Sequence, residues 1–141
     1  MVAGKNSRRG LWNHLAEKAD ENFNAANFLR EKKYYNAACN RFYYAVFQML
    51  FGVLLDEGID EKSYEHKHEK VSEFLKNKYS ETGELTRTFN SLKGYRIKAD
   101  YNRENSLTEQ DCLRCYDLAK SCYPKMKTNH RGGKPDVLDG F

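Results

Sequence analysis

The stretch NRFYYAVFQMLFGVLL, residues 40–55, is the segment of the chain that decides the fold. Apolar residues recur along it in steps of three and four, which predicts a helix from about Tyr34 to Glu57 with Gly58 as its left-handed cap. Its aromatic residues cover more than one face of that helix: Phe42, Tyr43, Tyr44, Phe47 and Phe51. A helix that is apolar nearly all round is buried on several sides. We therefore expect it at the centre of a helical bundle or also in a subunit interface, with base stacking by these rings as the weaker alternative.

Further helices are predicted on both sides of this segment. Apolar residues from Leu11 to Leu29 share one helical face and predict a helix over about 11–32. The spacing beyond residue 65 predicts a short helix over about 65–80, followed by a turn. The next predicted helix carries its partly apolar face on five residues: Leu85, Phe89, Leu92, Arg96 and Ala99.

The last predicted helix has the clearest start signal in the chain. Thr108 stands in the N-cap position, Asp111 follows three residues later, and Leu107 is placed to pack against Cys112. No alternating strand pattern competes with these helices. The sequence therefore predicts an all-α fold, an antiparallel up-and-down bundle of four to five helices over residues 11–127. Residues 1–10 and 128–141 are expected to be flexible tails.

The formal net charge of +4 belongs to the two ends of the chain. Residues 1–10 hold three basic residues and residues 125–141 hold four basic and two acidic ones, which leaves 17 basic and 18 acidic residues between Leu11 and Pro124. Only a local basic patch is therefore expected to attract nucleic acid. The chain shows no run of about 20 apolar residues and no apolar signal segment. We expect a cytoplasmic protein with reduced thiols and no membrane association.

Metal and cofactor chemistry is not predicted. Cys112 and Cys115 form a C-x-x-C pair on the apolar face of a helix, without a second ligand pair, so we interpret them as small buried residues. His66 and His68 point to different sides of a helix and cannot chelate one ion. The sequence contains no glycine-rich phosphate loop and no nucleophilic serine elbow, which excludes the common nucleotide hydrolases and esterases.

The end of the fourth predicted helix holds the remaining candidate site. Arg96 and Asp100 are one turn apart and can form an ion pair, and Tyr101 adds a hydroxyl group. On the residues alone, a solvated helix end with one weak ion pair is the preferred interpretation. The alternative is a functional site in which Arg96 binds a phosphate beside the hydroxyl donor Tyr101.

Three strings in this order resemble the HEPN family (higher eukaryotes and prokaryotes nucleotide-binding). Residues 40–55 resemble its second-helix signature, and KHEKVSEFLKNKYSETGEL at residues 67–85 is similar to the next helix and turn of the small stand-alone prokaryotic branch. RIKADY at residues 96–101 matches that branch's fourth-helix motif. The resemblance covers about residues 11–126. It implies a bundle of four to five helices, usually dimeric, in which the fourth-helix motifs of two protomers face a shared cleft.

The activity that the resemblance implies depends on one missing residue. Many HEPN proteins are metal-independent endoribonucleases, many are toxins neutralised by a small nucleotidyltransferase partner, and others bind nucleotide or RNA or are non-catalytic modules. The ribonuclease motif is an arginine followed four to six residues later by a histidine. Arg96 matches the arginine, but no histidine follows before His130, and Tyr101 stands in its place. Rapid RNA cleavage is not expected, because a tyrosine with an ordinary pKa of about 10 is a poor general base near neutrality.

The residues and the resemblance together predict a homodimer with a nucleotide- or RNA-contacting cleft, acting as half of a toxin–antitoxin-like module with a nucleotidyltransferase. Arg96 is expected to bind phosphate, Tyr101 to donate a hydrogen bond and Asp100 to orient Arg96, with Arg103 beside them. Two alternatives stay open. One is an active metal-independent endoribonuclease toxin with Arg96 and Tyr101 as catalytic residues, and the other is a purely structural helical module. No cofactor is expected.

Overall fold

The computed structural model describes residues 3–56, 69, 71–73, 75, 77, 83–101 and 106–130, and every regular element in these ranges is a helix. Four helices have continuous bounds: α1 (Ala3–Glu31), α2 (Tyr35–Asp56), α4 (Glu84–Tyr101) and α5 (Glu109–His130). Residues 69, 71–73, 75 and 77 are helical too, within the predicted third helix, whose other residues lie outside the described ranges. The predicted all-α class is confirmed.

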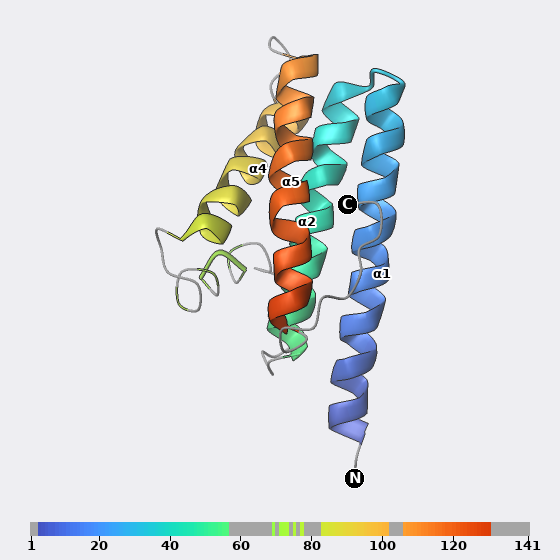
Figure 1. Ribbon diagram of the computed structural model, residues 1–141, viewed down its shortest axis with the longest axis vertical. Coiled ribbons are helices and arrows are strands. Elements are labelled where there is room, and N and C mark those ends of the chain that lie inside the picture. Colours follow the sequence, from blue (N-terminus) through green and yellow to red (C-terminus); the bar gives the residue numbers. More distant parts are fainter. Residues whose placement is uncertain are drawn as a thin grey trace.

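The four helices form a bundle in which each runs antiparallel to the one before it (Figure 1). α2 packs against all three others, and α4 is inclined to them. The C-terminal end of α4, the start of α5 and the connection from α1 to α2 lie at the same end of the bundle (Figure 1). No helix in the described part of the chain is both long and apolar enough to cross a membrane.

Helix boundaries agree with the predictions except near the ends of the chain. α2 lies within one residue of its predicted bounds at either end, while its predicted cap Gly58 lies outside the described residues. α1 begins at Ala3 and not at Leu11, because residues 3–10 have no apolar face that periodicity can detect. α5 runs to His130, past the expected domain end at residue 127. The division into a folded domain and flexible tails stays a prediction.

The aromatic side chains of α2 form the core of the protomer. Three of them have no exposed surface: Phe42, Tyr43 and Phe47. The Phe42 ring centroid lies 5.5 Å from that of Phe23 on α1 and 5.8 Å from that of Tyr116 on α5. The Tyr43 centroid lies 5.5 Å from that of Phe89 on α4. The predicted central place of this helix is thereby confirmed, and complete burial excludes base stacking by these three rings.

Two local motifs shape the end of the bundle where α1 meets α2. α1 ends in a Schellman motif: Lys33 has φ 69° and the Tyr34 N–H donates to the Leu29 carbonyl at 2.9 Å. α5 begins with the predicted capping box, in which the Thr108 N–H donates to Asp111 Oδ2 at 2.9 Å. The Asp111 N–H donates in return to Thr108 Oγ1 at 3.2 Å.

One hydrogen bond joins the residue before the α5 capping box to the first turn of α2. The Leu107 N–H donates to Asn36 Oδ1 at 2.8 Å, so the chain that enters α5 is held against the first turn of α2. The Leu107 side chain is buried as well. The start of α5 is thus fixed beside the α1–α2 connection.

Three cysteine side chains lie between α2 and α5. Cys39, Cys112 and Cys115 are free and fully buried, as predicted for the C-x-x-C pair. Hydrogen bonding with Cys39, together with burial, raises the pKa of the Cys112 thiol. The pKa of Cys39 is also raised: its hydrogen bond with Cys112 lowers it, but its hydrogen bond with Cys115 and its burial outweigh that effect. The Cys39 and Cys112 thiols are held in their neutral form.

Candidate functional site

Arg96 and Asp100 lie one turn apart on the face of α4 that meets α2. Arg96 Nη1 is 3.5 Å from Asp100 Oδ2, and the exposed fractions of the two side chains are 14% and 31%. The ion pair anticipated from the i, i+4 spacing is therefore present. Because its arginine is largely buried, water screens this pair less than it screens a pair on a solvated helix end.

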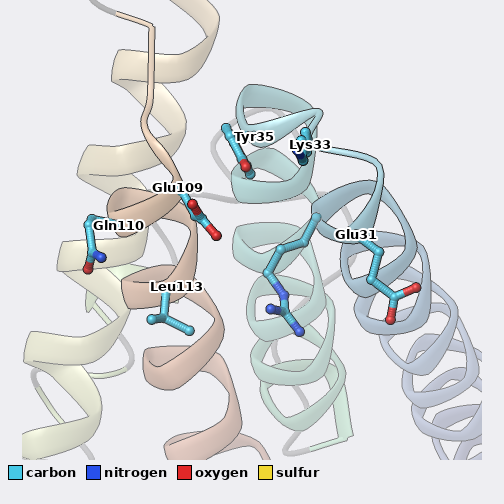
Figure 2. A pocket seen from close by; sticks show the side chains of 7 residues that line it. Glu31, Lys33, Tyr35, Glu109, Gln110 and Leu113 are labelled. Atoms are coloured by element: carbon cyan, nitrogen blue, oxygen red, sulfur yellow. The ribbon is translucent and has the colours of Figure 1, made fainter.

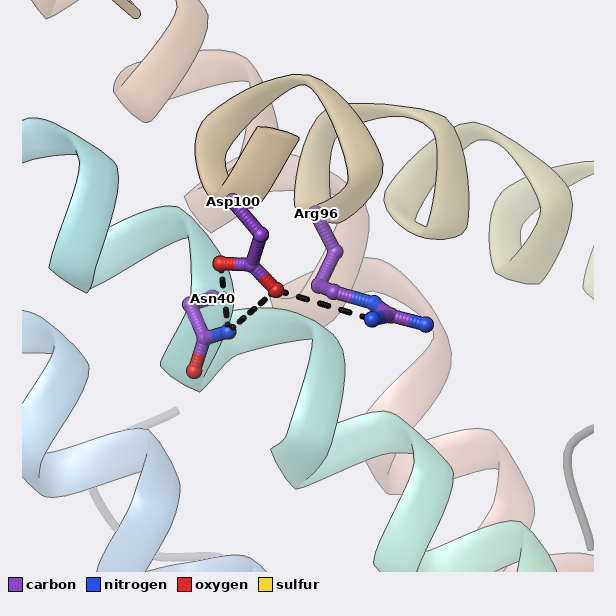
Figure 3. Close-up of polar contacts among 3 residues, drawn as sticks. All are labelled: Asn40, Arg96 and Asp100. Atoms are coloured by element: carbon purple, nitrogen blue, oxygen red, sulfur yellow. Dashed lines mark hydrogen bonds and ion pairs between the residues drawn. The ribbon is translucent and has the colours of Figure 1, made fainter. Parts of the chain in front are cut away.

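Asn40 of α2 completes this arrangement from the opposite helix. Its Nδ2 donates to Asp100 Oδ1 at 3.1 Å and to Oδ2 at 3.3 Å. Figure 3 shows the Asp100 carboxylate in contact with both Asn40 and Arg96. The carboxylate is thereby held from two sides, and through it the second helix restrains the direction of the arginine side chain.

A second partner of Arg96 is the buried ring of Tyr43. The guanidinium carbon Cζ lies 5.2 Å from the centroid of that ring, which is within cation–π range. Burial raises the pKa of the Tyr43 hydroxyl, and the charge of Arg96 offsets this only in part. Burial by itself would lower the pKa of Arg96, but the hydroxyls of Tyr44 and Tyr43 and the Asp100 carboxylate raise it by more. The cation is therefore permanent and the phenol neutral.

The held guanidinium keeps unused hydrogen-bonding capacity. A guanidinium has five N–H donors, and Arg96 Nε is buried with no hydrogen-bond partner. Nη1 faces Asp100, so Nε is the N–H donor of this group that an oxygen atom of a phosphate or a carboxylate could accept from. The arrangement can therefore bind an anion at the inner edge of α4. The described partners of Arg96 and Asp100, namely Asn40 and Tyr43, include no imidazole for proton transfer.

Tyr101 is placed differently from Arg96. It is the last residue of α4 and 73% exposed, and at about 100° per residue it lies some 140° around the helix from Arg96. The two side chains therefore face different directions within one protomer. Arg103, the fourth predicted site residue, lies outside the described residues. The structure thus joins Arg96 with Asp100 and leaves Tyr101 on the open surface.

Of the histidines in this chain, only His14 has a side chain that the structure describes. His14 is exposed on α1, and the predicted third-helix residues His66 and His68 lie outside the described ranges. Over the ranges that the structure describes, no group of three or more His, Cys, Asp or Glu side chains is arranged to hold a metal ion.

Reasoning from the sequence missed Asn40 as a member of this site. The available signal was its polarity, because a helix that is apolar nearly all round exposes few positions where an amide remains hydrated. A polar residue in such a helix needs a partner on a neighbouring element. Tyr43 was correctly placed in the core, but its contact with Arg96 could not be read from spacing.

The comparison with known families fits this helical arrangement. The sequence pattern of the HEPN domain matches residues 12–127. The chain belongs to the HEPN family. No curated protein and no solved structure matches it. The HEPN match includes all of α2 and α4, so Arg96, Asp100 and Asn40 lie within the domain, and membership supports an RNA-related or nucleotide-contacting function.

Proposed function

We propose that this HEPN protein binds RNA or a nucleotide through Arg96, on the face of α4 that meets α2. The observation that carries the proposal is a restrained guanidinium with a free donor. Its direction is set by Asp100 and Asn40, its plane lies near the Tyr43 ring, and its Nε has no hydrogen-bond partner. Binding to a group that is already ordered loses less side-chain entropy than binding to a mobile surface arginine.

The proposed binding unit is a homodimer in which the α4 ends of two protomers face each other. Support comes from the exposed apolar surface on the same stretch of α4, where Ile97 is 45% and Tyr101 73% exposed. The resemblance to dimeric HEPN proteins points in the same direction. In such a dimer, Tyr101 of one protomer can donate a hydrogen bond to a phosphate bound by Arg96 of the other.

The proposed cellular role is one half of a toxin–antitoxin-like module with a nucleotidyltransferase partner. This role rests on the family resemblance alone. If the protein is a toxin, its expression arrests growth and Arg96→Ala relieves the arrest. Normal growth on expression of the unchanged protein would contradict the toxin role.

Binding and cleavage of a labelled single-stranded RNA of mixed sequence test the proposal directly. Anisotropy measured in EDTA at one fixed salt concentration gives the affinity, and a gel of the same samples shows whether the RNA is cut. Arg96→Ala is expected to weaken binding about tenfold to hundredfold, the usual worth of a charge-assisted hydrogen bond. Arg96→Met is the matched control, because it keeps an unbranched side chain over Tyr43 and removes the charge together with the N–H donors.

Each outcome separates the functions considered. Intact RNA that binds the unchanged protein but not Arg96→Met supports a binding site. Arg96-dependent cleavage in EDTA would instead establish the endoribonuclease alternative. Equal binding by the unchanged protein and by both variants, with melting temperatures lowered in the variants, would leave Arg96 with a structural role only.

A further inference from the structure

A second group of polar side chains surrounds a pocket at the α1–α2 connection. The pocket has a volume of about 320 Å³, and Arg30, Lys33 and Glu109 are among the residues that line it. Figure 2 shows Glu109, Gln110 and Leu113 of α5 on one side and Tyr35 and Lys33 on the other. An adjoining hollow of about 400 Å³ shares Lys33 and Tyr35. Pockets of this size hold small organic molecules.

Arg30 brings to this pocket a cation that forms no ion pair with a described carboxylate. Its Cζ lies 4.6 Å from the centroid of the Tyr116 ring, which holds the guanidinium in place. Its Nε is buried without a hydrogen-bond partner, and within the described part of the chain no carboxylate pairs with it. A buried donor without a partner costs free energy that a ligand oxygen would recover.

Lys33 brings a second cation from an unfavourable backbone position. Its φ of 69° is in the left-handed region, at the point of the Schellman motif that glycine usually occupies. A lysine there is less stable than a glycine would be, yet its side chain lines both hollows. A charge placed in a pocket at the expense of stability is typical of a binding residue.

The rest of the lining sets the chemistry of the ligand. Glu31 and Glu109 add two carboxylates, so a bare anion would meet repulsion as well as attraction. Burial and the Glu109 carboxylate raise the pKa of the Tyr35 hydroxyl, which therefore stays a neutral hydrogen-bond donor. Leu113 adds an apolar surface that is 39% exposed. The lining suits a molecule with an anionic group, several hydroxyl or amino donors and one apolar face.

We infer that this pocket binds a small sugar phosphate, with a ribonucleotide as the best-fitting member of the class. The phosphate contacts Arg30 and Lys33, the ribose hydroxyls donate to Glu109, and the base packs against Tyr35 and Leu113. The site is separate from Arg96, because Tyr35 and Tyr43 are eight residues apart on α2, about 12 Å along the helix axis. It requires no second protomer and does not depend on the function proposed for Arg96.

The test is ligand binding to Lys33→Gly in an Arg96→Met background, which removes the other proposed phosphate site. Adenosine 5′-monophosphate and ribose 5-phosphate are expected to raise the melting temperature of the Arg96→Met protein, and adenosine is expected to leave it unchanged. Lys33→Gly should itself raise the melting temperature without ligand, since glycine relieves the backbone strain. Calorimetry should show the affinity for the monophosphate reduced at least tenfold in the same variant.

Glu109→Gln supplies the second measurement. It should weaken ribose 5-phosphate binding and leave any weak inorganic phosphate binding unchanged, because inorganic phosphate lacks the ribose hydroxyls that are proposed to donate to Glu109. Equal stabilisation by inorganic phosphate and ribose 5-phosphate would overturn the sugar-phosphate assignment. Unchanged monophosphate affinity in Lys33→Gly, or no ligand effect in the Lys33-containing protein at millimolar concentrations, would overturn the site.

Discussion

At the scale of single residues, the amide of Asn40 decides how α4 presents its arginine. It donates to both oxygens of Asp100, and Asp100 pairs with Arg96. Each hydrogen bond to a charged partner of this kind contributes on the order of 1–3 kcal/mol, more than the same ion pair would on a solvated surface. Asn40 of α2 thus restrains the direction of the Arg96 side chain on α4 through Asp100.

Replacement of Asn40 tests this control. Asn40→Ala should lower the free energy of unfolding by about 1–2 kcal/mol and weaken RNA binding, because Asp100 loses a partner and Arg96 loses its restraint. Asn40→Asp should destabilise the protein more at pH 7, since two carboxylates then face each other. Acidification toward pH 4 should reduce the difference in the free energy of unfolding between Asn40→Asp and the unchanged protein, because protonation of one carboxylate removes the repulsion.

Urea unfolding at both pH values measures these effects, and anisotropy with labelled RNA measures the binding. Arg41→Ala on the same turn of α2 is a suitable control, because Arg41 is exposed and contacts Asn22 of α1 instead of α4. If Asn40→Asp unfolds at pH 7 with the same free energy as the unchanged protein, the Asn40–Asp100 contact does not contribute to stability.

At the scale of helices, the contact of α2 with α5 contains thiols that resist ionisation. The pKa values of Cys39 and Cys112 are raised in the folded protein, whereas an unfolded chain ionises its thiols near pH 8.5. The folded state therefore binds these protons more tightly than the unfolded state. Their contribution to stability is complete below about pH 8.5 and is lost as the pH rises above that value.

We expect the free energy of unfolding to fall by about 2 kcal/mol between pH 9 and pH 10 through these two thiols. Cys112→Ala should reduce the decrease by about half, since it removes one of the two thiols. Urea unfolding across this pH range, with both proteins in reducing buffer, gives the two slopes. Identical slopes would show that the α2–α5 thiols do not differ from those of the unfolded chain.

The helices also show which parts of the fold are predictable from sequence. The start of α5 was predictable because Thr108 and Asp111 form a capping box from local chemistry alone. The start of α1 was not, because charged and polar residues before Leu11 leave no apolar period. The ion pair of the site followed from i, i+4 spacing. The contact of Asp100 with Asn40 depends on how α2 packs against α4, and no local pattern encodes a contact between residues 60 apart in sequence.

At the scale of the whole molecule, the proposed dimer would join surfaces that one protomer leaves exposed. Four aromatic residues of α2 are buried inside the protomer core and are not available to a second copy: Phe42, Tyr43, Phe47 and Phe51. The exposed apolar side chains of α4 are available: Ile97 and Tyr101. A dimer formed through them would bring the two Arg96 sites to one cleft and would double the local positive charge offered to a nucleic-acid strand.

Light scattering at tens of micromolar should therefore give twice the chain mass of 16.5 kDa. Ile97→Lys should give the monomer mass, because two facing lysines add repulsion where an apolar contact is lost. Phe28→Lys is the matched control: Phe28 is 59% exposed but lies on α1, so that variant should remain a dimer. RNA affinity should fall with Ile97→Lys although Arg96 is unchanged, because each monomer then offers half of the cleft. A monomer mass for the unchanged protein would reject the shared cleft and confine binding to the single restrained Arg96.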